Sequence, residues 1–395
     1  MVIGVDIRTL MEAQYSGIPG YTYDLLHQLL ACDQTNKYVL FYNTTKKIDI
    51  SKWRFNQPNV WLAGCSWPNK LYNASNKFLN RPRIDRFIKQ DIDLWYMPHF
   101  NFISLPGNKK IKKIITIHDL SFLRYPEFFS IYKNLWHQAI NIKKLLLEFD
   151  QLIAISQNTK RDLVELCHIS PDKIKVVPSA INSKYQVLDK TSGELRKFRQ
   201  QMNLPEKFIL YLGTLEPRKN IESLILAYNN LRQHNPYLYD YQLIIAGGQG
   251  WKYEQIYQLA EQSPYQHDIN FLGYVKEQDK VKLYNLASLF VFPSFYEGFG
   301  FPPLEAAACG IPTITSFASS LPEVMTDASL LIDPYNVQQL SLAIQQVLTN
   351  EALYQELVDK GLQRAREFNW QQTAEEYLQI FSNLTNNYNN DLIKN

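Results

Sequence analysis

Two carboxylates with a defined spacing are the first residues that could do chemistry. Glu297 and Glu305 are separated by seven residues, Gly298-Phe299-Gly300-Phe301-Pro302-Pro303-Leu304. Proline suits the first turn of a helix and glycine suits its C-terminal end, so a helix is predicted from these prolines to Gly310. Carboxylates accept hydrogen bonds from hydroxyl groups, and a nucleotide-sugar offers such groups on its sugar and its ribose. For Glu305, compensation of the helix dipole is the alternative interpretation.

A pair of cations follows a glycine turn earlier in the chain. The segment Gly213-Thr214-Leu215-Glu216-Pro217-Arg218-Lys219-Asn220 comes directly after an apolar run, and Asn220 is suited to cap the next helix. A helix N-terminus carries free N–H groups and partial positive charge. Arg218 and Lys219 would add two charges there, which predicts a diphosphate site whose cations stabilise a leaving group. A basic pair on the surface is the alternative.

Three further turns follow apolar runs. His118, with Asp119 beside it, ends the run Ile114–Ile117, and Gly17 follows the first run of the chain. Ser320 and Leu321 begin a predicted helix, where backbone N–H groups could reach a diphosphate. Ligands of open α/β sheets bind at the carboxyl ends of strands, so all three turns are candidates for the site. A lone histidine is often structural, and a lone Gly-x-x-Gly is weak evidence.

The elements that must position these residues are short apolar runs that alternate with amphipathic stretches. Runs rich in isoleucine and valine are typical of parallel strands covered on both faces by helices, so two doubly wound α/β domains are predicted. The expected domains are residues 1–185 and 205–370, and residues 371–395 form a helix and tail that return to the first. The strands are expected at Val2–Val5, Val39–Tyr42, Val60–Ala63, Leu94–Met97, Ile114–Ile117, Leu152–Ile155, Ile174–Val177, Phe208–Leu212, Leu243–Ala246, Ile269–Leu272, Leu289–Phe292, Thr313–Thr315 and Leu330–Ile332.

Composition excludes several classes of protein. The 395 residues are 46% hydrophobic and 20% charged, which is typical of a globular protein, and the net charge of +3 gives no reason to expect nucleic acid as a partner. The four cysteines lack the spacing of a zinc site, and unpaired cysteines favour a reducing compartment. The N-terminus does not read as a signal peptide and no run is long enough to span a bilayer. A cytoplasmic protein is expected, with possible peripheral contact between the basic first domain and the inner face of a membrane.

The two motifs together resemble those of the family 4 retaining glycosyltransferases. The spacing of Glu297 and Glu305 resembles the E-x7-E motif of that family, and the segment 213–220 resembles its phosphate-binding turn. The likeness covers nearly the whole chain and is strongest from about 208 to 335. It implies the GT-B fold, with two Rossmann-like domains facing a central cleft. It also implies transfer of a hexose from a nucleotide-sugar, without a metal or another cofactor, to a glycan or lipid-linked acceptor in polysaccharide biosynthesis.

The resemblance also implies roles for particular residues. Glu297 would contact the transferred sugar, Glu305 the ribose, and His118 the donor sugar, while Arg218 and Lys219 would bind the phosphates. Many family members carry their arginine directly after the glycine, where this chain has Thr214, so Lys219 is the firmer assignment. UDP-glucose and GDP-mannose are the expected donors, and no acceptor-binding residue is assigned. Further donor contacts are implied for Gly17, Gly213, Tyr274, Val275, Gly298, Phe299, Gly300, Ser320 and Leu321.

Alternative functions remain open at this point. A nucleotide-sugar epimerase, a sugar-phosphate phosphorylase or a non-catalytic nucleotide-sugar-binding protein could use the same fold. A nicotinamide dehydrogenase is disfavoured because no G-x-G-x-x-G fingerprint follows a first strand. Asp91-Ile92-Asp93 matches the D-x-D pattern of metal-dependent glycosyltransferases. It precedes a predicted strand, whereas a metal motif needs its carboxylates at the end of the strand that faces the site, so no metal is expected.

Overall fold

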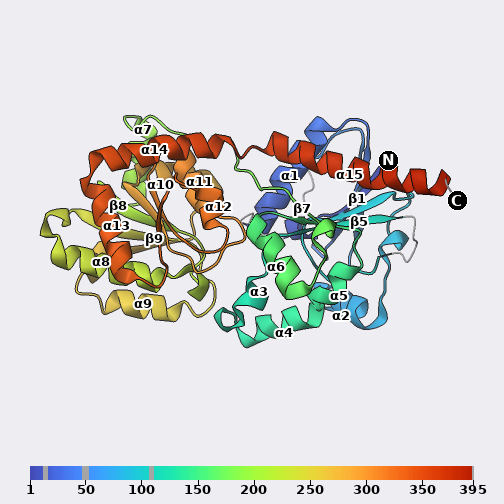
Figure 1. The fold of residues 1–395 in the computed structure, drawn as a ribbon, viewed down its shortest axis with the longest axis horizontal. Helices are drawn as coiled ribbons and strands as arrows, with labels where there is room; N and C mark the ends of the chain where they lie inside the picture. The colour runs from blue at the N-terminus through green and yellow to red at the C-terminus, as the bar shows by residue number, and fades with distance from the viewer. Residues whose placement is uncertain (12–16, 47–52, 106–110, 394–395) are drawn as a thin grey trace. The chain divides into compact units, whose positions relative to one another are not determined.

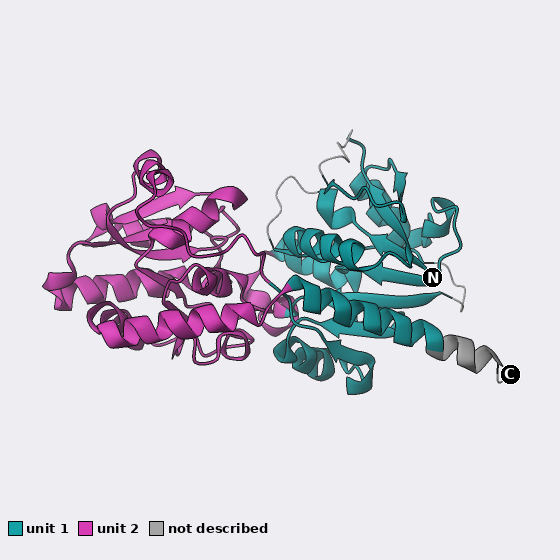
Figure 2. Ribbon diagram, turned by 90° about the horizontal axis from the view of Figure 1, so that it is seen from above, with its two compact units in different colours: residues 1–120, 131–180, 370–395 teal, residues 121–130, 181–369 magenta. Residues whose placement is uncertain are grey.

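The chain forms two compact units, each built on one parallel sheet (Figure 1). The computed structural model describes residues 1–11, 17–46, 53–105 and 111–393. Unit 1 comprises residues 1–120, 131–180 and 370–395, and unit 2 comprises residues 121–130 and 181–369 (Figure 2). The sequence-based division assigns residues 121–130 to the first domain, whereas they are grouped with unit 2. There the Trp251 indole N–H donates to the Phe128 carbonyl, and the Phe128 ring stacks on Phe295.

The sheet of unit 1 has seven parallel strands in the order β3-β2-β1-β4-β5-β6-β7. The chain first adds strands on one side of β1 and then continues from β4 on the other side, which is the doubly wound arrangement. The strands are β1 (Val2–Asp6), β2 (Lys37–Asn43), β3 (Val60–Cys65), β4 (Leu94–Met97), β5 (Lys112–Ile117), β6 (Gln151–Ala154) and β7 (Ile174–Val176).

The helices of unit 1 include the C-terminal one, which is fixed by a buried chain of hydroxyl groups. The Tyr377 hydroxyl lies 2.5 Å from that of Tyr21 and 2.7 Å from that of Thr116, which in turn lies 2.9 Å from the Tyr96 hydroxyl. These contacts join α15 to α1, β5 and β4. The helices are α1 (Ile18–Cys32), α2 (Asn69–Leu79), α4 (Ile131–Ile140), α5 (Ile142–Leu147), α6 (Gln157–Cys167) and α15 (Trp370–Ile393).

The sheet of unit 2 has six parallel strands in the order β10-β9-β8-β11-β12-β13. Its direction of winding changes between β8 and β11, so the turns after these two strands diverge and leave the crevice where ligands of such sheets bind. The strands are β8 (Lys207–Leu212), β9 (Tyr241–Ala246), β10 (Ile269–Gly273), β11 (Leu289–Phe292), β12 (Thr313–Ser316) and β13 (Leu330–Ile332).

Two groups of helices cover the sheet of unit 2. Helix α8 contacts α9 and α13 on one face, while α11 contacts α10 and α14 on the other (Figure 1). Because both faces are covered, the central strands are apolar on both sides, as in Phe208, Leu210 and Phe290. The helices are α3 (Ser121–Arg124), α7 (Gly193–Gln201), α8 (Ile221–His234), α9 (Glu254–Glu261), α10 (Glu277–Leu286), α11 (Phe301–Ala308), α12 (Leu321–Met325), α13 (Val337–Thr349) and α14 (Glu351–Arg366).

Each apolar run that predicts a strand is a strand in the structure, with bounds that differ by at most two residues at either end. The predicted fold class, two doubly wound α/β units, is therefore confirmed. None of the described helices combines the length and the apolar character needed to cross a membrane.

Candidate functional site

The crevice of unit 2 lies between the turns that follow β8 and β11. The backbone of the first turn is held against the next strand, because the Gly213 N–H donates to the Ala246 carbonyl over 2.9 Å. Gly247 has a φ of +147°, and a Cβ there would lie 1.8 Å from the Gly213 oxygen. Only glycine therefore allows this close approach. It fixes where the segment that carries Arg218 and Lys219 begins.

Four charged side chains, three of them buried, lie together in this crevice. The Lys219 ammonium lies 2.7 Å from Glu297 Oε1, and Arg218 Nη1 lies 3.0 Å from Glu297 Oε2. Arg218 Nη2 also lies 2.7 Å from Glu216 Oε1. Burial by itself raises the pKa of Glu297, but the charges of Arg218 and Lys219 outweigh it and hold that pKa below its ordinary value. The carboxylate is therefore ionised and oriented, which makes it a strong hydrogen-bond acceptor for hydroxyl groups.

The turn that carries Glu297 is fixed by two serines from the end of β12. The Glu297 N–H donates to the Ser319 hydroxyl over 2.7 Å, and the Ser320 hydroxyl donates to the carbonyls of Glu297 and Phe299. The Leu321 N–H donates to the Ala318 carbonyl over 3.2 Å. The predicted contact of the Leu321 N–H with a diphosphate would require this bond to open. Ser320 contributes its side chain to the turn.

Glu305 lies deeper than the sequence predicts. Helix α11 begins at Phe301 after Gly300, whose φ is +119°, so Glu305 is in the second turn rather than the first. The Tyr284 hydroxyl donates to Glu305 Oε2 over 2.9 Å. Burial is the main cause that raises the pKa of Glu305; the Lys280 ammonium opposes the shift and the Glu277 carboxylate adds to it.

The two donor-contact residues predicted after β10, Tyr274 and Val275, differ in their exposure to solvent. Tyr274 is 44% exposed, whereas Val275 is buried at 5% exposure. Gly273 before them has a φ of +67°, a left-handed conformation that turns the chain out of the strand. The exposed Tyr274 ring is available to a ligand, while Val275 can offer only its backbone.

Asn220 does not cap the helix that follows it, contrary to the prediction. Its φ of 56° is left-handed, a conformation that asparagine tolerates, and its side chain makes no cap. The amide instead donates to the carbonyls of Pro293 and Pro334. Arg218 and Lys219 thus lie in a short 3-10 turn before α8, and Asn220 ties that turn to the end of β11.

Unit 1 places His118 at the carboxyl end of β5. Its Nε2 lies 2.8 Å from the Pro98 carbonyl, which can only accept, so Nε2 carries the proton and Nδ1 is the acceptor nitrogen. The Tyr21 ring contacts the imidazole edge-on, with centroids 4.6 Å apart. Burial lowers the pKa of His118 to about 4. The ring is therefore neutral at pH 7 and can accept a hydrogen bond from a hydroxyl.

Gly17 starts helix α1 of unit 1 with a φ of +60°. Nothing lies within 4 Å of the position a Cβ would take, so its conformation, not crowding, favours glycine. Residues 12–16, which precede it, lie outside the described residues.

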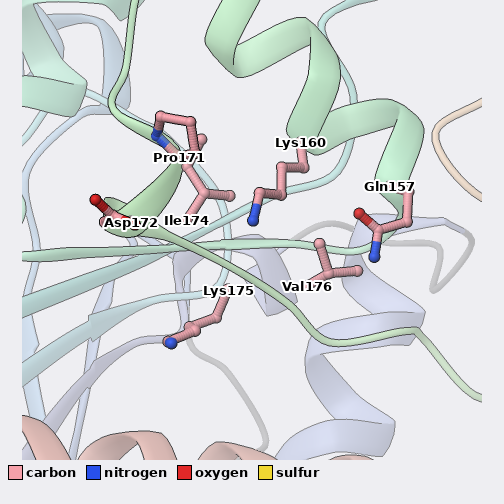
Figure 3. Close-up of a pocket in the computed structure, with 7 residues that line it drawn as sticks. All are labelled: Gln157, Lys160, Pro171, Asp172, Ile174, Lys175 and Val176. Carbon is pink, nitrogen blue, oxygen red and sulfur yellow. The ribbon is translucent and has the colours of Figure 1, made fainter.

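The D-x-D residues lie at the amino ends of the strands of unit 1, whereas His118 lies at the carboxyl ends. Asp93 Oδ2 accepts the N–H of Val2 over 2.7 Å, at the amino ends of β1 and β4. Within the described residues, no group of three or more His, Cys, Asp or Glu side chains is arranged to hold a metal ion. A cavity of about 400 Å³ in unit 1 also lies apart from the predicted residues (Figure 3). It is lined by Gln157, Lys160, Pro171, Asp172, Ile174, Lys175 and Val176.

Sequence reasoning missed several side chains that hold the site. Glu216 lies in the predicted phosphate-binding segment 213–220, two residues before Arg218. A carboxylate so close in sequence to an arginine predicts an ion pair, which is the signal that could have identified it. Tyr284 and Ser319 carry no such signal, because each acts through a contact between segments that are distant in sequence.

Comparison with known proteins identifies the family. Residues 16–185 match the family described as Glycosyltransferase Family 4, and residues 194–364 match the family described as Glycosyl transferases group 1. O-antigen chain mannosyltransferase B of Escherichia coli is 34% identical over 284 residues, 70% of this chain and 69% of that protein. The chain therefore belongs to glycosyltransferase family 4.

Other relatives are longer than this chain. The serotype-specific mannosyltransferase WbdA of Escherichia coli is 34% identical over 298 residues, which are 71% of this chain and 35% of WbdA. The matched part thus spans about a third of that protein.

Solved structures share the architecture. Sucrose-phosphate synthase from Thermosynechococcus elongatus has a TM-score of 0.74 at 21% identity, over 97% of this chain and 99% of that one. HepE from Anabaena in complex with UDP and glucose has a TM-score of 0.71 at 17% identity, over 97% and 100%. At these identities the likeness shows the fold alone, which is the GT-B fold.

Proposed function

We propose that the protein is a retaining, metal-independent mannosyltransferase that uses GDP-mannose as its donor. The observation that carries the proposal is the buried cluster of Glu297 with Lys219 and Arg218 at the crevice of unit 2, followed by Glu305 eight positions later. Relatives named as mannosyltransferases favour mannose over glucose, the other expected sugar. The acceptor is a glycan or a lipid-linked saccharide in polysaccharide biosynthesis.

Each residue then has a chemical task. Glu305 accepts hydrogen bonds from the ribose, and ionised Glu297 accepts them from the transferred sugar. Neutral His118 offers Nδ1 to a sugar hydroxyl. Lys219 uses one of its three N–H groups on Glu297 and can give another to the diphosphate, where it stabilises the charge that develops on the leaving group.

The transfer step requires no protein nucleophile. The acceptor oxygen forms a bond to the anomeric carbon on the face from which the diphosphate leaves, as the carbon–oxygen bond to phosphate breaks. The acceptor proton passes to an oxygen of the leaving phosphate. Attack and departure on the same face retain the anomeric configuration, and the Lys219 ammonium and backbone dipoles take the place of a metal.

The location follows from the same proposal. A cytoplasmic enzyme meets a cytoplasmic nucleotide-sugar, and all four cysteines are free. Exposed apolar side chains beside lysines on α2 and α4 of unit 1 favour peripheral contact with an anionic membrane surface, where a lipid-linked acceptor would lie.

Calorimetric titration of a nucleotide-sugar panel with EDTA present tests the assignment. We expect GDP-mannose to bind without metal and Glu305→Ala to weaken it roughly tenfold or more, because hydrogen bonds to a charged group are worth about 1.5–3 kcal/mol. Glu222→Ala, an exposed carboxylate of α8, is the matched control and should bind like the wild type.

A hydrolysis assay and product analysis separate the alternatives. Slow release of GDP in EDTA, and an α-linked product from the α-linked donor by proton NMR, support the retaining transferase. An epimerase would convert the sugar without releasing the diphosphate, and a pure binding protein would do neither. Binding of UDP-glucose instead would change the donor, and a requirement for a divalent cation would refute metal independence.

A further inference from the structure

The pair Glu216–Arg218 occupies a position in the crevice that the proposed function leaves without a task. We propose that Glu216 is a positioning residue: it holds the Arg218 guanidinium so that Arg218 orients the Glu297 carboxylate, and Arg218 is not a ligand of the diphosphate. This inference rests on the proposed function, in which Glu297 contacts the transferred sugar.

The hydrogen bonds of Arg218 already fix its plane. Nε and Nη2 donate to the same oxygen of Glu216, over 3.1 and 2.7 Å. Nη1 donates to the Tyr296 carbonyl over 2.5 Å and lies 3.0 Å from Glu297 Oε2. A guanidinium presents its donors in a rigid planar fork. Once Glu216 holds one side of the fork, Nη1 on the other side lies against Tyr296 and Glu297.

The Glu297 carboxylate is held at both oxygens. Arg218 contacts Oε2 and Lys219 contacts Oε1, while the N–H of the same residue is bound by Ser319. A carboxylate fixed in this way keeps its remaining lone pairs in constant directions, which is what selective contact with one sugar hydroxyl requires. Loss of Arg218 would free one oxygen and let the group rotate.

Energetics disfavour a swing of Arg218 towards a phosphate. The Glu216 side chain is only 5% exposed. Removing its partner would leave a buried, unpaired carboxylate, which is strongly destabilising. A single charge-assisted hydrogen bond to a phosphate does not offset that penalty. The resting pair is therefore retained when the donor binds, and Lys219 is the cation of this segment left for the diphosphate.

Calorimetry with GDP alone and with GDP-mannose tests the inference, because only the second ligand reaches Glu297. For Glu216→Gln and Arg218→Lys we expect GDP affinity within about twofold of wild type, and GDP-mannose affinity and kcat of donor hydrolysis at least tenfold lower. Glu216→Asp should recover part of the loss. Lys219→Ala is the matched comparison, and it should weaken GDP itself.

Two controls keep the result interpretable. The double variant Glu216→Gln, Arg218→Gln removes both charges together, so it leaves neither buried ion unpaired if a single variant fails to fold. It should show the same selective loss of GDP-mannose binding. A tenfold loss of GDP affinity in Arg218→Lys and in the double variant would overturn the inference, because it would make Arg218 a diphosphate ligand. Failure of the wild type to bind GDP or UDP at all would overturn the proposed function as well, and is thereby distinguished.

Discussion

The two glutamates of the E-x7-E spacing have opposite electrostatic surroundings. Glu297 lies between Arg218 and Lys219, which hold its pKa below the ordinary value, whereas burial raises the pKa of Glu305. The first therefore stabilises the folded chain when it is ionised, and the second destabilises it. An ionised carboxylate is the stronger hydrogen-bond acceptor, so at Glu305 the proposed function opposes stability.

Substitution should reveal this difference as opposite changes in thermal stability. A lowered carboxyl pKa contributes stability above the unfolded pKa, and that stability is lost as pH falls through the folded pKa. A raised one imposes a penalty that is complete above the folded pKa. At pH 7 we expect Glu297→Gln to lower the Tm of unit 2 by several degrees and Glu305→Gln to raise it by roughly 2–4 °C.

Differential scanning calorimetry at pH 7 and pH 4 measures both effects. The rise for Glu305→Gln should shrink at pH 4, where the wild-type carboxyl takes up a proton. Glu222→Gln on the exposed face of α8 controls for loss of charge alone. Equal shifts of the same sign in both variants would contradict the electrostatic account.

At the level of elements, sequence patterns were sufficient for the strands but not for the turns. Runs such as Phe208–Leu212 are apolar at every position because helices cover both faces. The composition of such a run is therefore enough to predict a buried strand. Asn220 carries the local signal of a cap, yet its amide is used by the carbonyls of Pro293 and Pro334. The hydrogen-bond partners of Asn220 are distant in sequence, so a local pattern cannot predict them.

The candidate site divides in the same way. The positions of Glu297, Lys219 and His118 after strands follow from the pattern, because parallel strands end at one edge. The role of Glu216 and the bond from Tyr284 to Glu305 depend on side-chain geometry. Residues 121–130 show the same limit for domains, since stacking on Phe295 and Trp251 places them in unit 2.

Helices α2 and α4 present apolar side chains to solvent, which carries a prediction about membranes. Phe78 is 75% exposed and Ile131 is 77% exposed, with Lys70, Lys77 and Lys133 nearby in sequence. Burial of one such side chain is worth about 1.5–3 kcal/mol. Phe78→Ser together with Ile131→Ser should therefore reduce sedimentation with phosphatidylglycerol vesicles at least roughly tenfold.

Two comparisons test that result. Tyr239→Ser removes an equally exposed aromatic ring from unit 2 and should leave vesicle binding unchanged. Neutral phosphatidylcholine vesicles should bind weakly, because the lysines add attraction only to anionic headgroups. If the wild type sediments with neither kind of vesicle, the proposed membrane contact is wrong.

At the scale of the whole molecule, histidines whose pKa is lowered by burial make unit 1 sensitive to acid. Burial lowers the pKa of His99 to about 3, and those of His118 and His137 to about 4, from an ordinary value of 6.5. The histidines of the unfolded chain bind protons at a higher pH than those of the folded chain. The free energy of unfolding therefore falls as pH drops below 6.5. In unit 2, the carboxylates with lowered pKa, Glu277 and Glu297, lose their contribution only below about 4.5.

Acidification from pH 6.5 to 4.5 should therefore weaken unit 1 first, with a fall in its Tm of roughly 5–10 °C. Six of the seven tryptophans lie in unit 1 and only Trp251 lies in unit 2, so tryptophan fluorescence follows the first unit. His118→Asn should make the dependence shallower. A fluorescence Tm that stays constant over this range would show that the histidines are not buried in the neutral form.

The return of α15 to unit 1 also sets an order of events during synthesis on the ribosome. Tyr377 is fully buried against Tyr21 and Thr116, yet the whole of residues 181–369 is translated before it. Until the last helix emerges, the face of α1 that receives it is uncovered and its hydroxyl chain is incomplete. Unit 1 is thus begun first but completed only after unit 2, and the face of α1 that receives α15 stays uncovered while unit 2 is made.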